Sequence, residues 1–332
     1  MVYITLPNED TTRPLPFYLA MEEYVAHTIQ EDECFFMWQV EPTVIFGRNQ
    51  LIENEVNLDY CREHHIHAFR RKSGGGCVYA DMNNVMFSYI TREENVSITF
   101  LRYINKVVDA LRHLGICATA TGRNDIMIGD KKVSGNAFYH IPGHSIVHGT
   151  MLYDTDMQNM VGSITPSNAK LVSKGIKSVR QHIALLKNYT TLDLEAFKET
   201  MREQLCDREI ILEDKDICAI QEIEKEYHTT EFIYGKNPRY TLTRKGRIEG
   251  AGDFEVRMEL KNGIIKDINI MGDFFLVGDI DNSLIKPLKG TALQTEALEK
   301  VLPEHLEEII MNLHQKEFIN LLIHGKQENM SL

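Results

Sequence analysis

The sequence predicts an α+β protein with two domains. A large domain of mixed β-sheets flanked by helices comes first, and a small α/β domain follows. Apolar residues recur at helical spacing in segments 17–30 and 97–114. In contrast, residues 116–154 read as short strands separated by glycine and proline turns. A polar, glycine-rich stretch then precedes a second compact unit. The expected domains are 1–245 and 250–332.

Each element of the first domain has a local signal. The helix at 17–30 is followed by two β-rich runs within 34–47 that are broken at Glu41-Pro42. The long helix at 97–114 stops at Gly115, which is a common C-terminal stop. We expect further helices at 56–64, 192–206 and 214–227, and further strands at 67–71, 77–80 and 85–91.

The second domain is predicted to open with two strands, 253–260 and 264–270, joined by a turn containing Asn262-Gly263. Helical spacing then indicates a helix at 293–300 and a long helix at 304–322. These few elements are enough for a small independent unit.

Composition limits the class of protein. The chain has 332 residues, 43% of them hydrophobic and 25% charged, as in ordinary folded proteins. A net charge of −12 argues against a protein that coats nucleic acid. No apolar stretch reaches the roughly 20 residues that span a bilayer. The six cysteines are scattered and form no CxxC pair, which favours reduced thiols. The N-terminus does not resemble a signal sequence, so we expect a cytoplasmic protein.

The first candidate site is the run Ser73-Gly74-Gly75-Gly76, preceded by Arg70-Arg71-Lys72. Three glycines form either a flexible connector or a place where backbone approaches a ligand closely. Because strands are predicted on both sides of the glycines, the glycine amides are expected to form a concave surface for an anion. Strand alternation sends Arg70 and Arg71 to opposite faces, so we expect Arg71 and Ser73 to address the ligand.

A second cationic stretch, GRNDIMIGDKKVSG, contains Asp125, Lys132, Ser134 and Gly135. Lysines beside a hairpin turn are usually solvated edge charges. The hydroxyl and bare backbone that follow Lys132 instead favour a second anion-binding surface. The strand after it, HSIVHGTMLYDTD, carries His148 and Thr150, and a cationic segment from Lys174 to Arg180 lies further along.

These stretches, taken together, resemble the lipoate-protein ligases. The family pattern RRxSGGGxVYxD is matched by RRKSGGGCVYAD, and GRNDIxxxGKKxSG by GRNDIMIGDKKVSG. The HGTxLxxTD, KGIKSV and upstream PTVxxGRxQ elements are matched by HGTMLYDTD, KGIKSV and PTVIFGRNQ, and GDFF resembles part of the family's C-terminal accessory domain. Cys77 departs from the pattern, because a small residue is common there.

The resemblance implies a biotin/lipoate ligase-like fold and a two-step reaction. Lipoate and ATP would give lipoyl-adenylate and pyrophosphate, and the lipoyl group would then pass to a protein lysine. The acceptors implied are lipoyl domains of 2-oxo acid dehydrogenase subunits or the glycine-cleavage carrier protein. Neither nucleic acid nor membrane is an expected partner.

The joining of two anions requires fixed positive charge, and we assign that role to Lys132. Asp125 is either the ligand for Mg²⁺ brought by ATP or a residue that caps the local turn. Asn84 is expected to hydrogen-bond phosphate or base.

The glycines of the run 74–76 would line the acyl chain and adenylate. We expect His148 and Thr150 to close the lipoyl pocket, with an apolar wall drawn from Val44, Ile45, Val78 and Val147.

Three alternatives remain. An octanoyl transferase of the same fold would use Cys117 as a nucleophile and need no ATP. A biotin ligase would carry GRGRxG and KWPND, which are absent. A non-catalytic module that binds lipoate or a nucleotide belongs to another class of protein.

Overall fold

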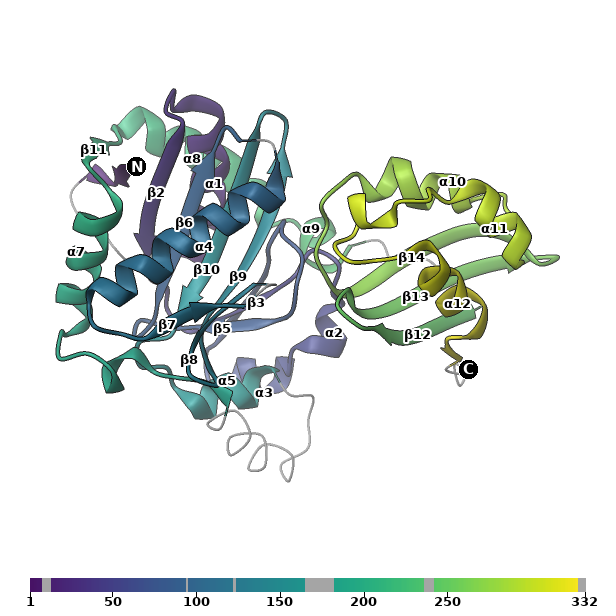
Figure 1. Cartoon of the computed structure of the whole chain (residues 1–332), viewed down its shortest axis with the longest axis horizontal. Helices are drawn as coiled ribbons and strands as arrows, with labels where there is room; N and C mark the ends of the chain where they lie inside the picture. Colours follow the sequence, from purple (N-terminus) through teal and green to yellow (C-terminus); the bar gives the residue numbers. More distant parts are fainter. Residues whose placement is uncertain (8–12, 94, 122–123, 165–181, 236–241, 328–332) are drawn as a thin grey trace. The chain divides into compact units, whose positions relative to one another are not determined.

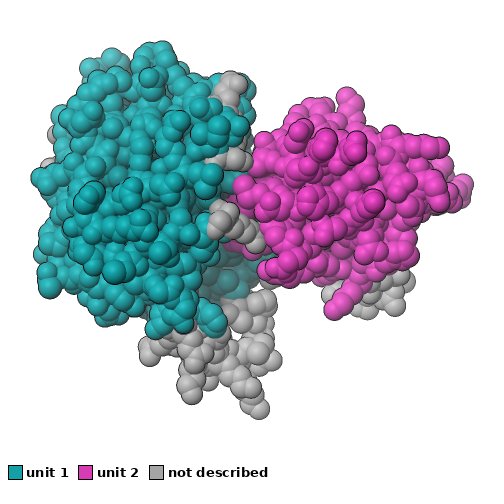
Figure 2. Space-filling model, viewed as in Figure 1, with its two compact units in different colours: residues 1–46, 52–71, 77–233 teal, residues 47–51, 72–76, 234–332 magenta. Residues whose placement is uncertain are grey.

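The chain forms two compact units (Figures 1 and 2). The computed structural model describes residues 1–7, 13–93, 95–121, 124–164, 182–235 and 242–327. Unit 1 comprises residues 1–46, 52–71 and 77–233, and unit 2 comprises residues 47–51, 72–76 and 234–332. Two short loops from the first quarter of the sequence therefore belong to the same compact unit as the C-terminal part of the chain.

A mixed eight-stranded sheet forms the centre of unit 1, in the order β11-β1-β2-β6-β10-β9-β8-β7. Strand β1 is parallel to β2 and β11, and the other pairs are antiparallel. The bounds are β1 Val2–Thr5, β2 Glu33–Trp38, β6 Val85–Thr91, β7 Ala118–Ala120, β8 Asp125–Ile128, β9 Lys131–Ile141, β10 His144–Met151 and β11 Arg208–Ile211. The meander expected at 116–154 is confirmed as β7 to β10.

A smaller sheet in unit 1 has the order β4-β3-β5. Strand β3 is parallel to β4 and antiparallel to β5. The bounds are β3 Thr43–Phe46, β4 His67–Arg70 and β5 Val78–Ala80. The predicted break at Glu41-Pro42 therefore separates two strands that belong to different sheets.

Helices cover both faces of the large sheet. Helix α1 (Leu15–Thr28) shares a hydrophobic core with Ile90 and Ile146 and packs against α8 (Asp214–Tyr227). Helix α4 (Val96–His113) lies on the opposite face, where Phe100 meets Phe138. The other helices of this part are α2 Ile52–Glu55, α3 Leu58–Glu63, α5 Met157–Ile164, η2 Leu186–Asn188, α7 Leu194–Leu205 and α9 Thr230–Tyr234.

Unit 2 contains a four-stranded antiparallel sheet in the order β14-β13-β12-β15, with helices around a core of its own. The bounds are β12 Leu242–Ile248, β13 Gly252–Lys261, β14 Ile264–Phe274, β15 Lys326–Gln327, η3 Asp281–Ile285, α10 Lys286–Leu288, α11 Thr295–Val301, η4 Leu306–Glu308 and α12 Gln315–His324. The polar stretch that we expected near the domain boundary contains β12.

The prediction of one helix over 304–322 is wrong. Only η4 and α12 are helical there, and Asn312 adopts a left-handed conformation with φ 58°. Between them, Ile310 forms a β-bridge with Leu276, and the Met311 amide donates to the Phe275 carbonyl at 3.0 Å. This tertiary pairing overrides the helical spacing of the apolar residues. The α+β class itself, with mixed sheets flanked by helices, is confirmed.

Candidate active site

One row across the large sheet brings together several of the predicted site residues. Thr150 on β10 pairs with Gly135 on β9, and Gly135 pairs with Asp125 on β8. Directly paired residues project from the same face of a sheet. Asp125 and Thr150 therefore flank the bare backbone of Gly135 on one face.

Lys132 reaches this row because the β8–β9 register shifts between Ile126 and Met127. Its ammonium lies 2.8 Å from Asp125 Oδ1. A Cβ atom on Gly135 would lie 2.7 Å from Lys132 Cε and 2.8 Å from Nζ, so the lysine side chain occupies the space that this glycine leaves open. At 37% exposure the Lys132 side chain is still within reach of a ligand.

The ion pair between Lys132 and Asp125 contributes little to the stability of the fold. Partly exposed pairs of this kind usually contribute about 0–1 kcal/mol to stability. The placement of a cation over a bare strand, next to one carboxylate, is instead suited to binding the oxygens of an anionic ligand.

Ser134 does not join this group. It precedes Gly135 in the strand and so points to the opposite face. There it is buried, and its Oγ accepts a hydrogen bond from Asn136 Nδ2 at 3.0 Å. The structure thus separates Ser134 from Lys132, although the sequence suggested one surface.

His148 projects from the same face as Thr150, two residues along β10. Its Nδ1 lies 3.0 and 2.9 Å from the two carboxylate oxygens of Glu22, a residue of α1 that is 0% exposed. Ser88 Oγ donates to Glu22 Oε1 at 2.6 Å. Glu22 is not among the residues that the sequence motifs predicted. The available signal was a pair of adjacent glutamates inside an otherwise apolar helix, because one of two such residues can face the core.

The four apolar residues expected to form the pocket wall lie in different parts of unit 1. Val78 pairs with Ile45, and both pack in the core cluster that also holds Trp38 and Met86. Val44 belongs to a separate cluster with Phe46 and Tyr79. Val147 alternates with His148 along β10 and so faces the other side of the sheet.

The glycine loop, residues 72–76, packs within unit 2. The Gly75 amide donates to the Phe274 carbonyl at 2.9 Å, and a Cβ on Gly74 would lie 2.3 Å from that oxygen. A Cβ on Gly76 would lie 3.0 Å from Asp273 Oδ2. The Ser73 carbonyl accepts from the Arg48 amide at 2.9 Å, and Ser73 is fully buried. The bare backbone here is therefore required for close contact with the end of β14.

Arg71 and Asn84 are both buried in unit 1. Arg71 Nη1 donates to the Ile45 carbonyl at 2.9 Å. Asn84 Nδ2 donates to Asp81 Oδ1 at 3.0 Å, and burial raises the pKa of the Asp81 carboxyl. Within the part of the chain that the structure describes, Asn84 Oδ1 has no hydrogen-bond partner. A buried amide oxygen of this kind is a ready acceptor for a ligand.

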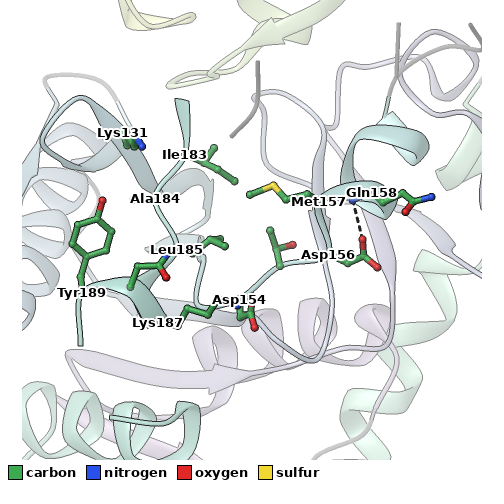
Figure 3. Close-up of a pocket in the computed structure, with 12 residues that line it drawn as sticks. Lys131, Asp154, Asp156, Met157, Gln158, Ile183, Ala184, Leu185, Lys187 and Tyr189 are labelled. Atoms are coloured by element: carbon green, nitrogen blue, oxygen red, sulfur yellow. Dashed lines mark hydrogen bonds and ion pairs between the residues drawn. The ribbon is translucent and has the colours of Figure 1, made fainter. Parts of the chain in front are cut away.

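A pocket of about 550 Å³ lies beside the start of β9 (Figure 3). The segment after residue 182 forms one wall, because Lys132 bridges to Ile183 and its carbonyl accepts from the Ala184 amide at 2.7 Å. The labelled lining residues include Lys131, Asp154, Asp156, Lys187 and Tyr189. The cationic segment from Lys174 to Arg180 lies outside the described residues.

Sequence comparison assigns the family. Residues 14–206 match the family described as "Lipoyl protein ligase A/B catalytic domain", and residues 237–322 match "Bacterial lipoate protein ligase C-terminus". The chain belongs to the lipoate-protein ligase family. It is 35% identical to lipoate-protein ligase 1 of Staphylococcus aureus, across 96% of this chain and 99% of that protein. It is 34% identical to lipoate-protein ligase LplJ of Bacillus subtilis, across 92% and 95%. Members of this family are enzymes.

Solved structures of lipoate ligases share the fold. LipL1 of Plasmodium falciparum, solved in complex with lipoate, has a TM-score of 0.72 at 21% identity and covers 97% of this chain and 98% of its own. A lipoate-protein ligase A bound with ATP has a TM-score of 0.60 at 24% identity, covering 70% of this chain and 98% of its own. A bipartite ligase of Thermoplasma acidophilum, studied with its E2 lipoyl domain, has a TM-score of 0.63 at 25% identity, covering 72% and 98%.

Two further properties concern the setting of the reaction. Among the described residues, no helix is both long enough and apolar enough to cross a bilayer. All six cysteines are free thiols, and burial raises the pKa of the Cys77 thiol, which follows the glycine loop in the sequence.

Proposed function

We propose that this ligase activates lipoate with ATP and transfers the lipoyl group to a lysine of a lipoyl-accepting domain. In the first step a carboxylate oxygen of lipoate attacks the α-phosphorus of ATP. The bond to the bridging oxygen of pyrophosphate breaks, so lipoyl-AMP and pyrophosphate form. In the second step the neutral lysine amine attacks the acyl carbon, AMP leaves, and the nitrogen loses a proton to give the amide.

The single observation that supports this proposal best is the position of Lys132. Its ammonium lies over the bare backbone of Gly135 and within 2.8 Å of Asp125, on a face that also carries Thr150 and His148. The first step brings a carboxylate oxygen toward a phosphate, and both are anions. One compact cation placed to contact both oxygens lowers the barrier by screening their repulsion.

The neighbouring pocket and Asp125 fit MgATP as the second substrate. The pocket is bounded by the strand that carries Lys132 and includes Lys131 and Lys187 in its lining. Mg²⁺ in ATP sites is usually held by one or two carboxylates together with phosphate oxygens. Asp125 would supply such a carboxylate, and Asn84 Oδ1 would accept a hydrogen bond from the nucleotide or its water.

For the acceptor, we infer a lipoyl domain of a 2-oxo acid dehydrogenase subunit or the glycine-cleavage carrier protein. The Thermoplasma ligase, studied with its E2 lipoyl domain, supports this class of partner. We place the reaction in the cytoplasm, which the six free thiols support.

The ATP-independent octanoyl transferase is the second candidate, and the position of Cys117 weighs against it. Cys117 is exposed and comes directly before β7, whose first residue, Ala118, pairs with Ile128 at the end of β8. Asp125 lies at the other end of the four-residue strand β8. A nucleophilic thiol needs a base or cation beside it, and the candidate cation Lys132 is engaged at the Asp125 end.

The decisive assay uses the full chain, lipoate, ATP and a lipoyl domain as acceptor. We expect lipoate-dependent exchange of labelled pyrophosphate into ATP, and a gain of lipoyl mass by the acceptor that requires ATP. Acyl transfer without ATP would contradict the proposal and favour the octanoyl transferase. Absence of both exchange and transfer would contradict every ligase mechanism.

A further inference from the structure

Glu22 is a buried carboxylate for which the reaction outlined above has no role. It is 0% exposed and lies on α1, with its side chain against the face of the sheet that carries His148. A buried carboxylate is costly unless several hydrogen bonds compensate for the lost water. The groups around Glu22 therefore show how the charge is accommodated.

Three polar groups converge on the Glu22 carboxylate. Ser88 Oγ lies 2.6 Å from Oε1, Tyr139 Oη lies 3.4 Å from Oε2, and His148 Nδ1 lies about equally far from both oxygens, at 3.0 and 2.9 Å. Trp38 Nε1 donates to Ser88 Oγ at 2.8 Å. An indole nitrogen only donates, so the hydroxyl hydrogen of Ser88 is left to point at Glu22. Glu22 thus accepts from the Ser88 and Tyr139 hydroxyls, and His148 Nδ1 lies within hydrogen-bonding distance of both carboxylate oxygens.

This arrangement fixes the histidine ring. An ionised carboxylate can only accept hydrogen bonds, so it pairs with the form of the ring that carries hydrogen on Nδ1, and Nε2 lies on the far side of the ring from Glu22. His148 is 6% exposed and sits two residues from Thr150, in the row next to Gly135. Glu22 therefore favours a ring with Nδ1–H toward the carboxylate, held in one direction on the face that carries Lys132.

We propose that Glu22 is a positioning residue that acts through His148, holding Nε2 toward the acyl substrate on the Lys132 face. This inference rests on the proposed function, because the substrate it concerns is lipoate. Carboxylates that orient metal-binding histidines in this way typically change activity by about 10- to 100-fold when they are removed, and we expect an effect of this size here. If Glu22 only stabilised the fold, its removal would lower activity by the same factor whether or not His148 is present.

The test is a double-mutant cycle with Glu22→Gln and His148→Ala, measured by lipoate-dependent pyrophosphate exchange. We expect Glu22→Gln to lower kcat/KM for lipoate about tenfold or more in the wild-type background, and less than about twofold in the His148→Ala background. Glu23→Gln is the matched control. Glu23 is the next residue on α1 and accepts a hydrogen bond from Tyr227. Thermal midpoints measured for all variants separate loss of folding from loss of position.

A second readout follows the ring itself. Long-range proton–nitrogen spectra of histidine-labelled protein, with His148→Ala for assignment, should show Nδ1 protonated in wild type and in Glu23→Gln. Glu22→Gln should show loss of that single state. Equal activity losses in both backgrounds, or an unchanged His148 spectrum in Glu22→Gln, would overturn the inference. A wild-type enzyme without exchange would overturn the proposed function, and the spectra would still decide whether Glu22 sets the tautomer.

Discussion

The loop Ser73–Gly76 and the hairpin residues Lys132–Gly135 have similar compositions but different structural causes. Each combines a serine and glycine with neighbouring cations. In the loop, Gly74 is bare because the backbone oxygen of Phe274 would lie 2.3 Å from a Cβ. In the hairpin, Gly135 is bare beneath the flexible end of Lys132. A glycine beside a cation can therefore serve backbone packing in one region and the placement of a charge in another.

The largest expected effect is on Lys132. We expect Lys132→Ala to lower lipoate-dependent pyrophosphate exchange by about 10²- to 10³-fold, the usual cost of removing one preorganised charge or donor. Lys106→Ala is the matched control. Lys106 also forms an ion pair, with Glu33 at 2.6 Å, and is 33% exposed, but it lies on α4, on the other face of the sheet. Similar losses for the two variants would show that the charge on Lys132 has no special place in the reaction.

Gly135→Ala tests whether the hairpin glycine serves the position of Lys132. The new methyl group would lie 2.8 Å or less from Cε and Nζ, so the ammonium must move. Because displacement by about 1 Å can cost up to 10²-fold in rate, we expect exchange to fall about 10- to 100-fold. The midpoint of thermal unfolding should change little. A large loss of stability with normal activity of the folded fraction would contradict this interpretation.

Gly74→Ala should have the reverse signature. A methyl group there meets a backbone oxygen that cannot rotate away, and overpacking of this kind typically costs about 1–3 kcal/mol. We expect urea unfolding of the full chain to shift to lower midpoint for the phase that reports on unit 2. An unchanged midpoint would mean that the loop separates from Phe274 without cost.

The smallest expected effect is that of Cys117→Ser. Because Cys117 is exposed and lies just before β7, on the side away from the Ala120–Ile126 pair, it should be dispensable for ATP-dependent transfer. We expect wild-type rates of lipoyl transfer to the acceptor domain. Loss of transfer in this variant, with ATP-independent octanoyl transfer by the wild type, would favour the thiol mechanism instead.

Local signals were sufficient for the elements that rest on local periodicity. Helices α4 and α8 begin and end within one residue of the predicted bounds. Helix α7 begins at Leu194 because Asp193 is the N-cap, with its side chain accepting from the Ala196 amide at 2.8 Å. The helix predicted over 304–322 failed because Ile310 pairs with Leu276, a contact that no local pattern encodes.

The same limit applies to the candidate site. The motif around Lys132 and Gly135 is local, so its residues could be chosen from the sequence. That Ser134 points to the opposite face follows from strand alternation only once residues 131–141 are known to form one strand. Glu22 meets His148 across 126 residues of sequence, and Gly75 meets Phe274 across a longer separation still. Contacts of this range become visible only once the sheet registers are known.

The most direct test of the central claim is a crystal structure of the enzyme with a stable analogue of lipoyl-AMP. We predict that Lys132 Nζ lies within about 3 Å of both the acyl carbonyl oxygen and a phosphate oxygen of the analogue, with the ligand against Gly135. An analogue bound elsewhere, with the Lys132 ammonium still paired only to Asp125, would contradict the account.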